Sequence, residues 1–374
     1  MEPEVMARAV VLDKFGATPS LREFSIPEPE AGELLIAGTY GGVCGTDLHL
    51  QRGHLPIPLP LVLGHEGLGT VSQIGGDMTD ALGEQLSPGD RVMWASSIAC
   101  GTCVPCRQYR EPTLCENRLT YGVNRPALEG DALSGAWAEY IRLHPGAAVI
   151  KVPDAIDDLT AIAFACAGPT MVHALFERRP VRLGETVVVQ GSGPVGLAAA
   201  AFAQLAGAQR VIIVGGPAGR LEKAKQSGIG DEHIDIIDQG PEAAARQVRE
   251  LVPAGADLVV ECTGVPEAVA QGIGFARRGG AYLIVGQYTD AGPTTINPHH
   301  IVRQQLTVVG SWAFSGAHLV EYVRMLPALA SRFDLSRLVT VYPLEEFANA
   351  LTAVGQGRVL KAVLAATRAQ RGRE

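Results

Sequence analysis

The stretch TVVVQGSGPVGLAAAAFAQLAGAQRVIIVGG, residues 186–216, decides the fold of this chain. Thr186 to Gln190 is a β-branched run, GSGPVG is a turn, Leu197 to Ala206 is an alanine-rich helix, and Arg210 to Val214 is a second β-branched run. This order predicts a β-turn-α-β unit in a parallel sheet, where buried strands are continuous Val/Ile runs and the crossover helix is buried too. The uncharged stretch from Thr186 to Ala208 imitates a membrane span, but the glycine turn inside it argues against one.

The turn has the pattern G-x-G-x-x-G between that strand and that helix. The first glycine permits a tight turn, the second lets a phosphate approach the backbone, and the third allows close packing of helix on strand. The helix N-terminus offers unpaired N–H groups and a positive dipole end to a pyrophosphate. We therefore predict dinucleotide binding rather than a plain glycine-rich turn, with contacts from Gly191, Gly193, Pro194, Val195 and Gly196.

The expected acidic residue after the second strand is missing, and Gly215 and Gly216 stand at that place. A carboxylate there would bind the ribose hydroxyls of NAD and repel the 2′-phosphate of NADP. Its absence removes the main barrier to NADP, and Arg220 is close enough in sequence to meet a phosphate. Arg220 could equally cap the following helix or lie in solvent, so NAD and NADP both stay open.

Four cysteines lie in the loop CGTCVPCRQYREPTLC, residues 100–115. Two-residue spacers let thiolates converge on Zn²⁺, which binds four such ligands tetrahedrally. With all four positions filled the site is closed, so we predict a structural zinc held by Cys100, Cys103, Cys106 and Cys115. The alternatives are a pair of disulfides or unrelated thiols.

Length and charge limit the other possibilities. A chain of 374 residues exceeds the usual size of one core, so two domains are expected. The net charge of -8 argues against a nucleic-acid partner, and therefore against a zinc-ribbon module. The sequence starts MEPEVMARAV and shows no secretory signal, so we expect a cytosolic protein that acts on small molecules and binds neither membrane nor nucleic acid.

Three more motifs complete a resemblance that covers nearly the whole chain. They are GVCGTD at 42–47, GHE at 64–66 and CAGPT at 166–170. Together with the cysteine loop and GSGPVG, in this order, they resemble the zinc-dependent alcohol dehydrogenases of the medium-chain dehydrogenase/reductase family. The last gap in the cysteine loop, from Cys106 to Cys115, is one residue longer than is common in that family.

The resemblance implies a second, catalytic zinc bound by Cys44, His65 and Cys166, with Glu66 able to enter the coordination shell. Three protein ligands leave one position open, where zinc would lower the pKa of an alcohol hydroxyl towards neutrality. The alcohol would then lose a hydride to NAD or NADP. Polyol dehydrogenases of the family often carry glutamate where Cys166 stands, so the sequence favours the alcohol dehydrogenase branch.

The same resemblance assigns roles to residues after Cys44. Asp47 would orient the His65 ring from outside the coordination shell. Thr46 would accept the proton of the substrate hydroxyl and pass it through the cofactor ribose to His49 at the solvent edge. Other histidines, His54 among them, have no comparable register and are interpreted as structural.

The fold implied is α/β: a mostly β, GroES-like catalytic domain from residues 1–162 and 310–374, and a Rossmann doubly wound parallel sheet from 163–309. The family commonly pairs its cofactor sheets edge to edge across a two-fold axis. The strand expected from Val308 to Trp312 would be that edge. A homodimer or homotetramer is therefore expected.

The substrate pocket is placed by resemblance at Leu55, Ser96 and Trp137. A small residue at Ser96 would widen the site for branched or cyclic secondary alcohols. The alternatives within enzymes are a polyol or amino-alcohol dehydrogenase, and the alternative outside them is a cofactor-sensing structural relative.

Overall fold

The computed structural model describes residues 5–128 and 131–366, and these residues form two compact units. The first unit contains the described parts of Met1–Cys166, Ser315–Arg324 and Val339–Glu374, and the second contains Ala167–Phe314 and Met325–Leu338. The sequence placed the boundaries at 162/163 and 309/310. The division differs in that residues 163–166 stay with the first unit, whereas residues 310–314 and Met325–Leu338 belong to the second unit rather than the first.

The first unit is built on antiparallel strands. Its largest sheet has the order β10-β6-β5-β3-β18-β17, with β9 also paired to β3, and a smaller sheet has the order β2-β1-β4. In the described residues its strands are β1 (Met6–Leu12), β2 (Ser20–Ser25), β3 (Leu34–Val43), β4 (Leu61–Val62), β5 (Gly67–Ile74), β6 (Arg91–Trp94), β7 (Ser97–Ile98), β8 (Leu119–Thr120), β9 (Tyr140–Leu143), β10 (Val149–Lys151), β17 (Val339–Pro343) and β18 (Lys361–Ala365).

Helices of the first unit are few and short. They are α1 (Gly45–Arg52), α2 (Asp158–Ile162) and α11 (Phe347–Gly355), while α10 (Gly316–Arg332) runs from the first unit into the second. Two apolar clusters fill this unit, one around Trp94 and Tyr121 and the other around Trp137 and Leu364. Strands β3 and β18 are almost wholly buried, so the residues that β3 leads into are held firmly.

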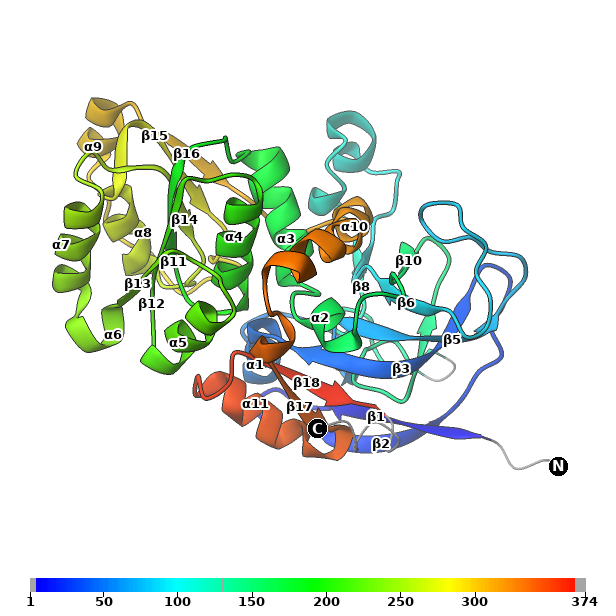
Figure 1. Cartoon of the computed structure of the whole chain (residues 1–374). Coiled ribbons are helices and arrows are strands. Elements are labelled where there is room, and N and C mark those ends of the chain that lie inside the picture. The colour runs from blue at the N-terminus through cyan, green and yellow to red at the C-terminus, as the bar shows by residue number, and fades with distance from the viewer. Residues whose placement is uncertain (1–4, 129–130, 367–374) are drawn as a thin grey trace. The chain divides into compact units, whose positions relative to one another are not determined.

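The second unit is a doubly wound parallel sheet with strand order β13-β12-β11-β14-β15-β16. Helix α4 lies on one side of this sheet, and α7 and α8 lie on the other (Figure 1). The strands are β11 (Thr186–Gln190), β12 (Arg210–Gly215), β13 (Glu232–Asp235), β14 (Ala256–Glu261), β15 (Ala276–Ile284) and β16 (Thr307–Gly310). The helices are α3 (Ala167–Val172), α4 (Pro194–Leu205), α5 (Ala218–Gln226), α6 (Ile236–Gln239), α7 (Pro241–Leu251), α8 (Pro266–Ile273) and α9 (Pro298–Gln304).

The segment 186–216 folds as its pattern predicts. Strand β11 is followed by the glycine turn, by α4 and by β12, which pairs in parallel with β11 from Thr186↔Arg210 to Gln190↔Val214. Helix α4 begins three residues earlier than expected, because Pro194 can occupy the first turn, where its missing N–H costs no hydrogen bond. In the described part of the chain, no helix is both long enough and apolar enough to span a membrane.

Candidate functional site

The four cysteines of the 100–115 loop converge in the first unit. Their sulfur atoms all lie within 4.8 Å of one another, and the Cys103 and Cys115 sulfurs are 3.9 Å apart. Two thiolates on a tetrahedral zinc would be about 3.8 Å apart, whereas a disulfide bond measures about 2.05 Å. None of the described cysteines forms a disulfide. The geometry therefore fits the closed zinc site, and the disulfide alternative is wrong.

Hydrogen bonds prepare this loop for a metal. The Cys100 sulfur accepts hydrogen bonds from the Thr102 hydroxyl and from the N–H groups of Thr102 and Cys103, each at 3.4 Å. These bonds, led by the Thr102 hydroxyl, lower the pKa of Cys100 to about 5. The Cys100 N–H in turn donates to the Cys115 sulfur at 3.2 Å. Because the thiolate is the metal-binding form, the loop is pre-organised for binding.

A second cluster joins Cys44, His65, Glu66 and Cys166, whose ligand atoms also lie within 4.8 Å of one another. Cys44 caps the start of α1, His65 and Glu66 lie between β4 and β5, and Cys166 follows α2. All four residues belong to the first unit, so this cluster is internal to it. The residues that the resemblance named as catalytic-zinc ligands are thus brought together.

The donor set suits zinc. A hydrogen bond from the Cys166 thiol holds the pKa of the Cys44 thiol well below its usual value, although burial opposes this. The Nε2 atom of His65 lies 4.0 Å from Oε1 of Glu66, and no described residue forms a hydrogen bond with it. A thiolate and a buried ring nitrogen without a hydrogen bond, facing one small space, are what a metal with Cys and His ligands requires.

Asp47 lies behind His65, as the resemblance implied. Its carboxylate is completely buried, and its Oδ1 atom lies 3.4 Å from Nδ1 of His65. Its Oδ2 atom accepts the N–H of Cys44 at 2.8 Å, which caps the first turn of α1. One carboxylate therefore fixes two of the ligand-bearing residues.

A buried lysine that the sequence motifs did not indicate lies beside this cluster. Lys361, at the start of β18, is paired with Oε2 of Glu66, and the two residues are 3% and 2% exposed. Burial opposes the charge of Lys361, but the Glu66 carboxylate raises its pKa, while burial raises the pKa of Glu66. A Cβ on Gly42 would lie 2.6 Å from Oε2 of Glu66, so the glycine makes room for this pair. A lone lysine within the apolar stretch VLKAVLAA was the signal in the sequence.

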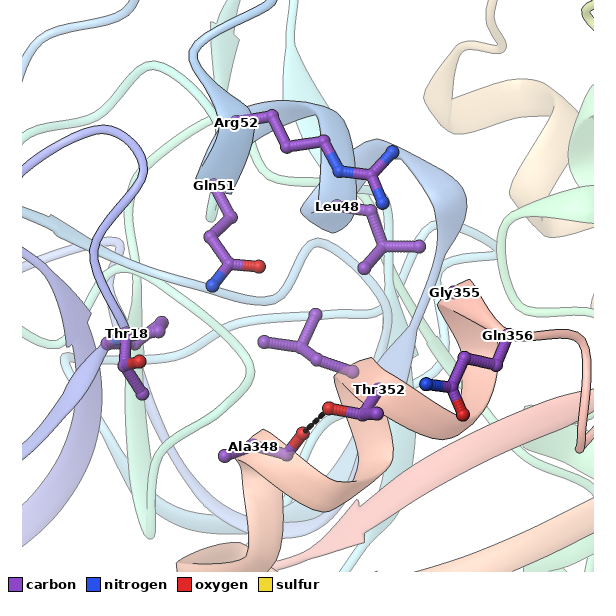
Figure 2. Close-up of a pocket in the computed structure, with 10 residues that line it drawn as sticks. Thr18, Leu48, Gln51, Arg52, Ala348, Thr352, Gly355 and Gln356 are labelled. Atoms are coloured by element: carbon purple, nitrogen blue, oxygen red, sulfur yellow. Dashed lines mark hydrogen bonds between the residues drawn. The ribbon is translucent and has the colours of Figure 1, made fainter.

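The proposed relay residues lie on α1. The Thr46 hydroxyl is 3.9 Å from the Cys44 sulfur, and His49 is one turn further along the helix. The Nδ1 atoms of His49 and His54 are 3.0 Å apart. On the same helix, Leu48 and Gln51 face Thr352 of α11 across a cavity of about 300 Å³ (Figure 2).

The three residues predicted to line the substrate pocket have different environments. Leu55 is half-buried against the cluster around Trp137, and Ser96 is 7% exposed. Trp137 is 0% exposed, and its Nε1–H donates to the Gly42 carbonyl at 2.8 Å. Its ring packs so closely on Gly64 that a Cβ there would lie 2.4 Å from it. Contrary to expectation, Trp137 is a core residue and offers no surface to a substrate.

The glycine turn of the second unit has the backbone that a dinucleotide site needs. Gly191 has a φ of 112°, a conformation that favours glycine, and Gly193 is the N-cap of α4. A Cβ on Gly196 would lie 2.0 Å from the Gly191 carbonyl, so the third glycine is required for packing. Pro194 and Val195 occupy the first turn of α4.

Gly215 has a steric reason to be glycine. A Cβ there would lie 2.7 Å from the backbone nitrogen of Ser192, inside the turn. The Ser192 hydroxyl also bridges the N–H and the carbonyl of Gly216, both at 2.9 Å. The missing carboxylate therefore reflects close packing of the two turns and is not by itself a signal for NADP.

Two charged groups lie near that end of β12. Arg220 is half-buried in the first turn of α5, and burial lowers its pKa. Asp235, which pairs with Gly215 in the sheet, accepts the N–H groups of Ile237 and Asp238 and so caps α6. The Asp235 carboxylate was not anticipated, because it comes from the next strand rather than from the one that ends at Gly215.

Buried Glu261 organises the neighbouring strand ends. Its carboxylate accepts hydrogen bonds from the N–H and hydroxyl of Thr263, from the N–H of Gly264 and from the N–H of Gly286, at 2.6 to 3.2 Å. Beside these ends is a cavity of about 470 Å³ lined by Pro266, by Val269 and by residues 287–292 and 294. Ligands of parallel sheets bind at such carboxyl ends, so this arrangement suits a dinucleotide.

Comparison with known protein families agrees with this geometry. The alcohol dehydrogenase GroES-like domain family matches residues 30–154, and the zinc-binding dehydrogenase family matches residues 194–331. The chain is 32% identical over 349 residues to a 5-exo-hydroxycamphor dehydrogenase from Pseudomonas putida, covering 92% of this chain and 95% of that protein.

Two further relatives act on other kinds of alcohol by name. A D-arabinitol dehydrogenase from Uromyces fabae is 31% identical over 91% of this chain and 93% of its own length. An L-threonine 3-dehydrogenase from Deinococcus deserti is 31% identical over the same shares of the two chains.

Solved structures extend the likeness to the fold. An alcohol dehydrogenase from Thermotoga maritima superposes with a TM-score of 0.91 at 34% identity, over 96% of this chain and 99% of that one. A zinc-binding dehydrogenase from Sinorhizobium meliloti, solved with NADP, gives a TM-score of 0.82 at 28% identity, over 97% and 100%.

Proposed function

Because this chain belongs to the zinc-dependent alcohol dehydrogenases of the medium-chain dehydrogenase/reductase family, we propose that it oxidises a secondary, cyclic alcohol to a ketone, with NAD or NADP as the hydride acceptor. Zinc and NAD(P) are the cofactors of this family, and alcohol oxidation is its reaction.

One observation carries the assignment of the catalytic centre. Cys44, His65 and Cys166 bring two sulfurs and one ring nitrogen to within 4.8 Å of one another, whereas the fourth residue of this cluster, Glu66, is paired with Lys361. Three protein ligands with one open position are the donor set of a catalytic zinc, in contrast to the closed four-cysteine loop. When bound there, zinc would supply a Lewis acid that acidifies the substrate hydroxyl.

The surrounding side chains hold and move protons. The Asp47 carboxylate, 3.4 Å from Nδ1 of His65, orients the ring so that Nε2 is the metal-binding nitrogen. Thr46, half-buried beside the Cys44 sulfur, is the group that receives the substrate proton. His49, at the partly exposed end of α1, would receive that proton when the ribose of a bound cofactor lies between it and Thr46, and it would release the proton towards solvent.

The second unit supplies the cofactor site. The glycine turn and the N-terminus of α4 bind the pyrophosphate, and Glu261 holds the neighbouring loops in place. Arg220 contacts the 2′-phosphate when NADP is bound, whereas Asp235 disfavours it by charge. The balance of these two groups sets the preference between NAD and NADP.

A cyclic alcohol is favoured by the chemistry of the predicted pocket. Ser96 is small and Leu55 is apolar, and neither carries a charge that would bind a carboxylate or an ammonium group. The hydroxycamphor dehydrogenase among the relatives is named for a bicyclic secondary alcohol. The second candidate is a polyol or amino-alcohol dehydrogenase, which the arabinitol and threonine enzymes represent.

A substrate panel tests the proposal directly. The zinc-loaded protein would be assayed by NAD(P)H absorbance with cyclohexanol, 5-exo-hydroxycamphor, a linear secondary alcohol, D-arabinitol and L-threonine, each with NAD and with NADP. We expect the highest kcat/KM with a cyclic alcohol and about two zinc ions per chain. A preference for arabinitol or threonine would support the second candidate, and one zinc ion without turnover would support a cofactor-sensing relative.

Two properties complete the proposal. We infer a homo-oligomer formed through β16, since this edge strand leaves Val308 exposed and its N–H and C=O groups on one side available for pairing. A cytosolic location is also part of the proposal, because the cysteine loop binds zinc only while its thiols stay reduced. Gel filtration or light scattering would measure the oligomeric state.

A further inference from the structure

The C-terminal end of α1 brings a second histidine against His49. Gly53 ends the helix in the left-handed conformation, with a φ of 77°, and its N–H donates to the Leu50 carbonyl. The N–H of His54 donates to the His49 carbonyl at 3.0 Å, which is the six-residue bond that commonly closes a helix. The backbone therefore turns back and fixes His54 over the end of α1.

The two rings are in direct contact. Their Nδ1 atoms are 3.0 Å apart, and the ring centroids are 5.3 Å apart at an interplanar angle of 47°. A hydrogen bond between two imidazole nitrogens contains a single proton, carried by one ring and accepted by the other. The bond uses one nitrogen of each ring, so Nε2 of His49 and Nε2 of His54 remain for other partners.

Exposure differs between the two rings. His49 is half-buried, whereas His54 is exposed to solvent. A proton that reached His49 would therefore have a next acceptor that is itself in contact with water. Figure 2 shows the neighbouring face of the same helix, where the residues of α11 that line the cavity carry no charge: Ala348, Leu351, Thr352, Gly355 and Gln356.

We propose that His54 is the outer member of a two-histidine proton relay, which takes protons from His49 and delivers them to water. This inference rests on the proposed alcohol oxidation, in which His49 receives the substrate proton. His54 touches neither substrate nor cofactor in this scheme, and it acts on the reaction through His49 as a positioning and relay residue.

The proton passes through the two rings one nitrogen at a time. His49 begins with its proton on Nδ1 and a lone pair on Nε2, where it accepts the incoming proton. Its Nδ1 proton moves across the hydrogen bond to Nδ1 of His54, which then loses its Nε2 proton to water. The starting tautomers return between turnovers when water protonates Nε2 of His54, the shared proton moves back to Nδ1 of His49, and the half-buried His49 ring loses its Nε2 proton to solvent.

The charges around His49 favour the neutral, proton-accepting ring. Burial lowers its pKa first, and the nearby His54 and Arg52 lower it further, while the Cys44 sulfur raises it. Removing His54 should therefore raise the pKa of His49. The acid limb of the pH profile should then move to higher pH, because His49 accepts a proton only when it is neutral.

The test compares His54→Gln with a remote control, His300→Gln, which lies exposed on α9. Alcohol oxidation would be measured from pH 5.5 to 9 in dilute buffer, with and without added imidazole. We expect His54→Gln to lower kcat/KM about two- to tenfold below pH 7, the size of one hydrogen bond, and imidazole to restore it. His300→Gln should match the parent. A loss that is equal at every pH, or one that imidazole does not restore, would overturn the relay.

Two further measurements separate failure of the relay from failure of the proposed function. In the His49→Gln background, His54→Gln should have no additional effect, whereas independent, multiplicative effects would contradict the proposal. Histidine side-chain NMR of the protein without substrate should show a higher pKa for His49 in His54→Gln, and an unchanged value would also overturn it. A parent enzyme that oxidises none of the alcohols would instead refute the proposed function, while the NMR result would still report on the histidine pair.

Discussion

Replacing Lys361 with methionine should destabilise the first unit strongly. Methionine keeps the length and apolar stem of lysine but removes the cation that faces Glu66. Both residues are almost completely buried, so the Glu66 carboxylate would be left without its counter-charge and without access to water. Removing one partner of a buried ion pair costs about 3–5 kcal/mol of folding free energy.

This loss is large enough to measure by calorimetry. A domain of 150–250 residues loses about 2–4 °C in Tm for each kcal/mol, so Lys361→Met should lower the Tm of the first unit by about 6–20 °C. The assay would be differential scanning calorimetry of the zinc-loaded protein, with zinc content measured on the same samples. The double variant Lys361→Met with Glu66→Gln should recover most of the loss, because it removes the buried charge as well.

The controls decide whether the ion pair is responsible. Glu66→Gln alone should also destabilise, since it leaves Lys361 buried without its carboxylate. Lys361→Met could instead retain both zinc ions and have a free energy of unfolding within about 1 kcal/mol of the parent. The Glu66 carboxylate would then not depend on Lys361, and the reasoning would be refuted. A double variant no more stable than the worse single variant would point to lost packing instead.

Three other predictions concern the metal sites, the cofactor and acid stability. Cys44→Ser should abolish turnover and leave dinucleotide binding, measured by fluorescence titration, intact. Cys103→Ser should remove about one zinc ion per chain and lower the Tm. Unchanged zinc content and Tm in Cys103→Ser would contradict the structural zinc site. Arg220→Ala should lower kcat/KM with NADP about tenfold or more relative to kcat/KM with NAD, because a charge-assisted hydrogen bond of about 1.5–3 kcal/mol is lost. An equal decrease with both cofactors would show that Arg220 does not discriminate between NAD and NADP. Burial opposes ionisation of Glu33, but a hydrogen bond from Arg142 lowers the pKa of this carboxyl in the folded protein. Glu33 therefore stabilises the fold above its pKa in the unfolded chain, about 4.3, and this stabilisation is lost as the pH falls through the lower pKa of the folded state. In urea unfolding from pH 7 to 3, Glu33→Gln should therefore show a smaller loss of stability below pH 4.3 than the parent, and parallel curves would contradict this.

The features that depend on neighbouring residues could be predicted from the sequence. The β-turn-α-β unit at 186–216 follows from local apolar runs and a glycine turn, and the parallel sheet follows from them. The four cysteines of residues 100–115 are close in the chain, so their spacing alone indicates convergence on a metal. The second metal cluster needed the resemblance, because Cys44, His65 and Cys166 are far apart in sequence.

The tertiary structure decided whatever depends on contacts between distant segments. Lys361 and Glu66 are 295 residues apart, and no local pattern pairs them. The burial of Trp137 is fixed by its packing on Gly64, from a strand connection much earlier in the chain. In the sequence, Gly215 was interpreted as the absence of a carboxylate that would bind the cofactor ribose. Its close approach to Ser192 gives a steric reason for glycine that only the packed turns reveal.

The pair of His49 and His54 depends on both the local sequence and the folded backbone. His49 and His54 are only five residues apart, yet on a continuing helix their side chains would point in different directions. They meet because Gly53 adopts a left-handed conformation and returns the chain over the last turn of α1. The sequence by itself determined which residues are near one another along the chain, whereas the backbone geometry of one glycine decided that these two rings touch.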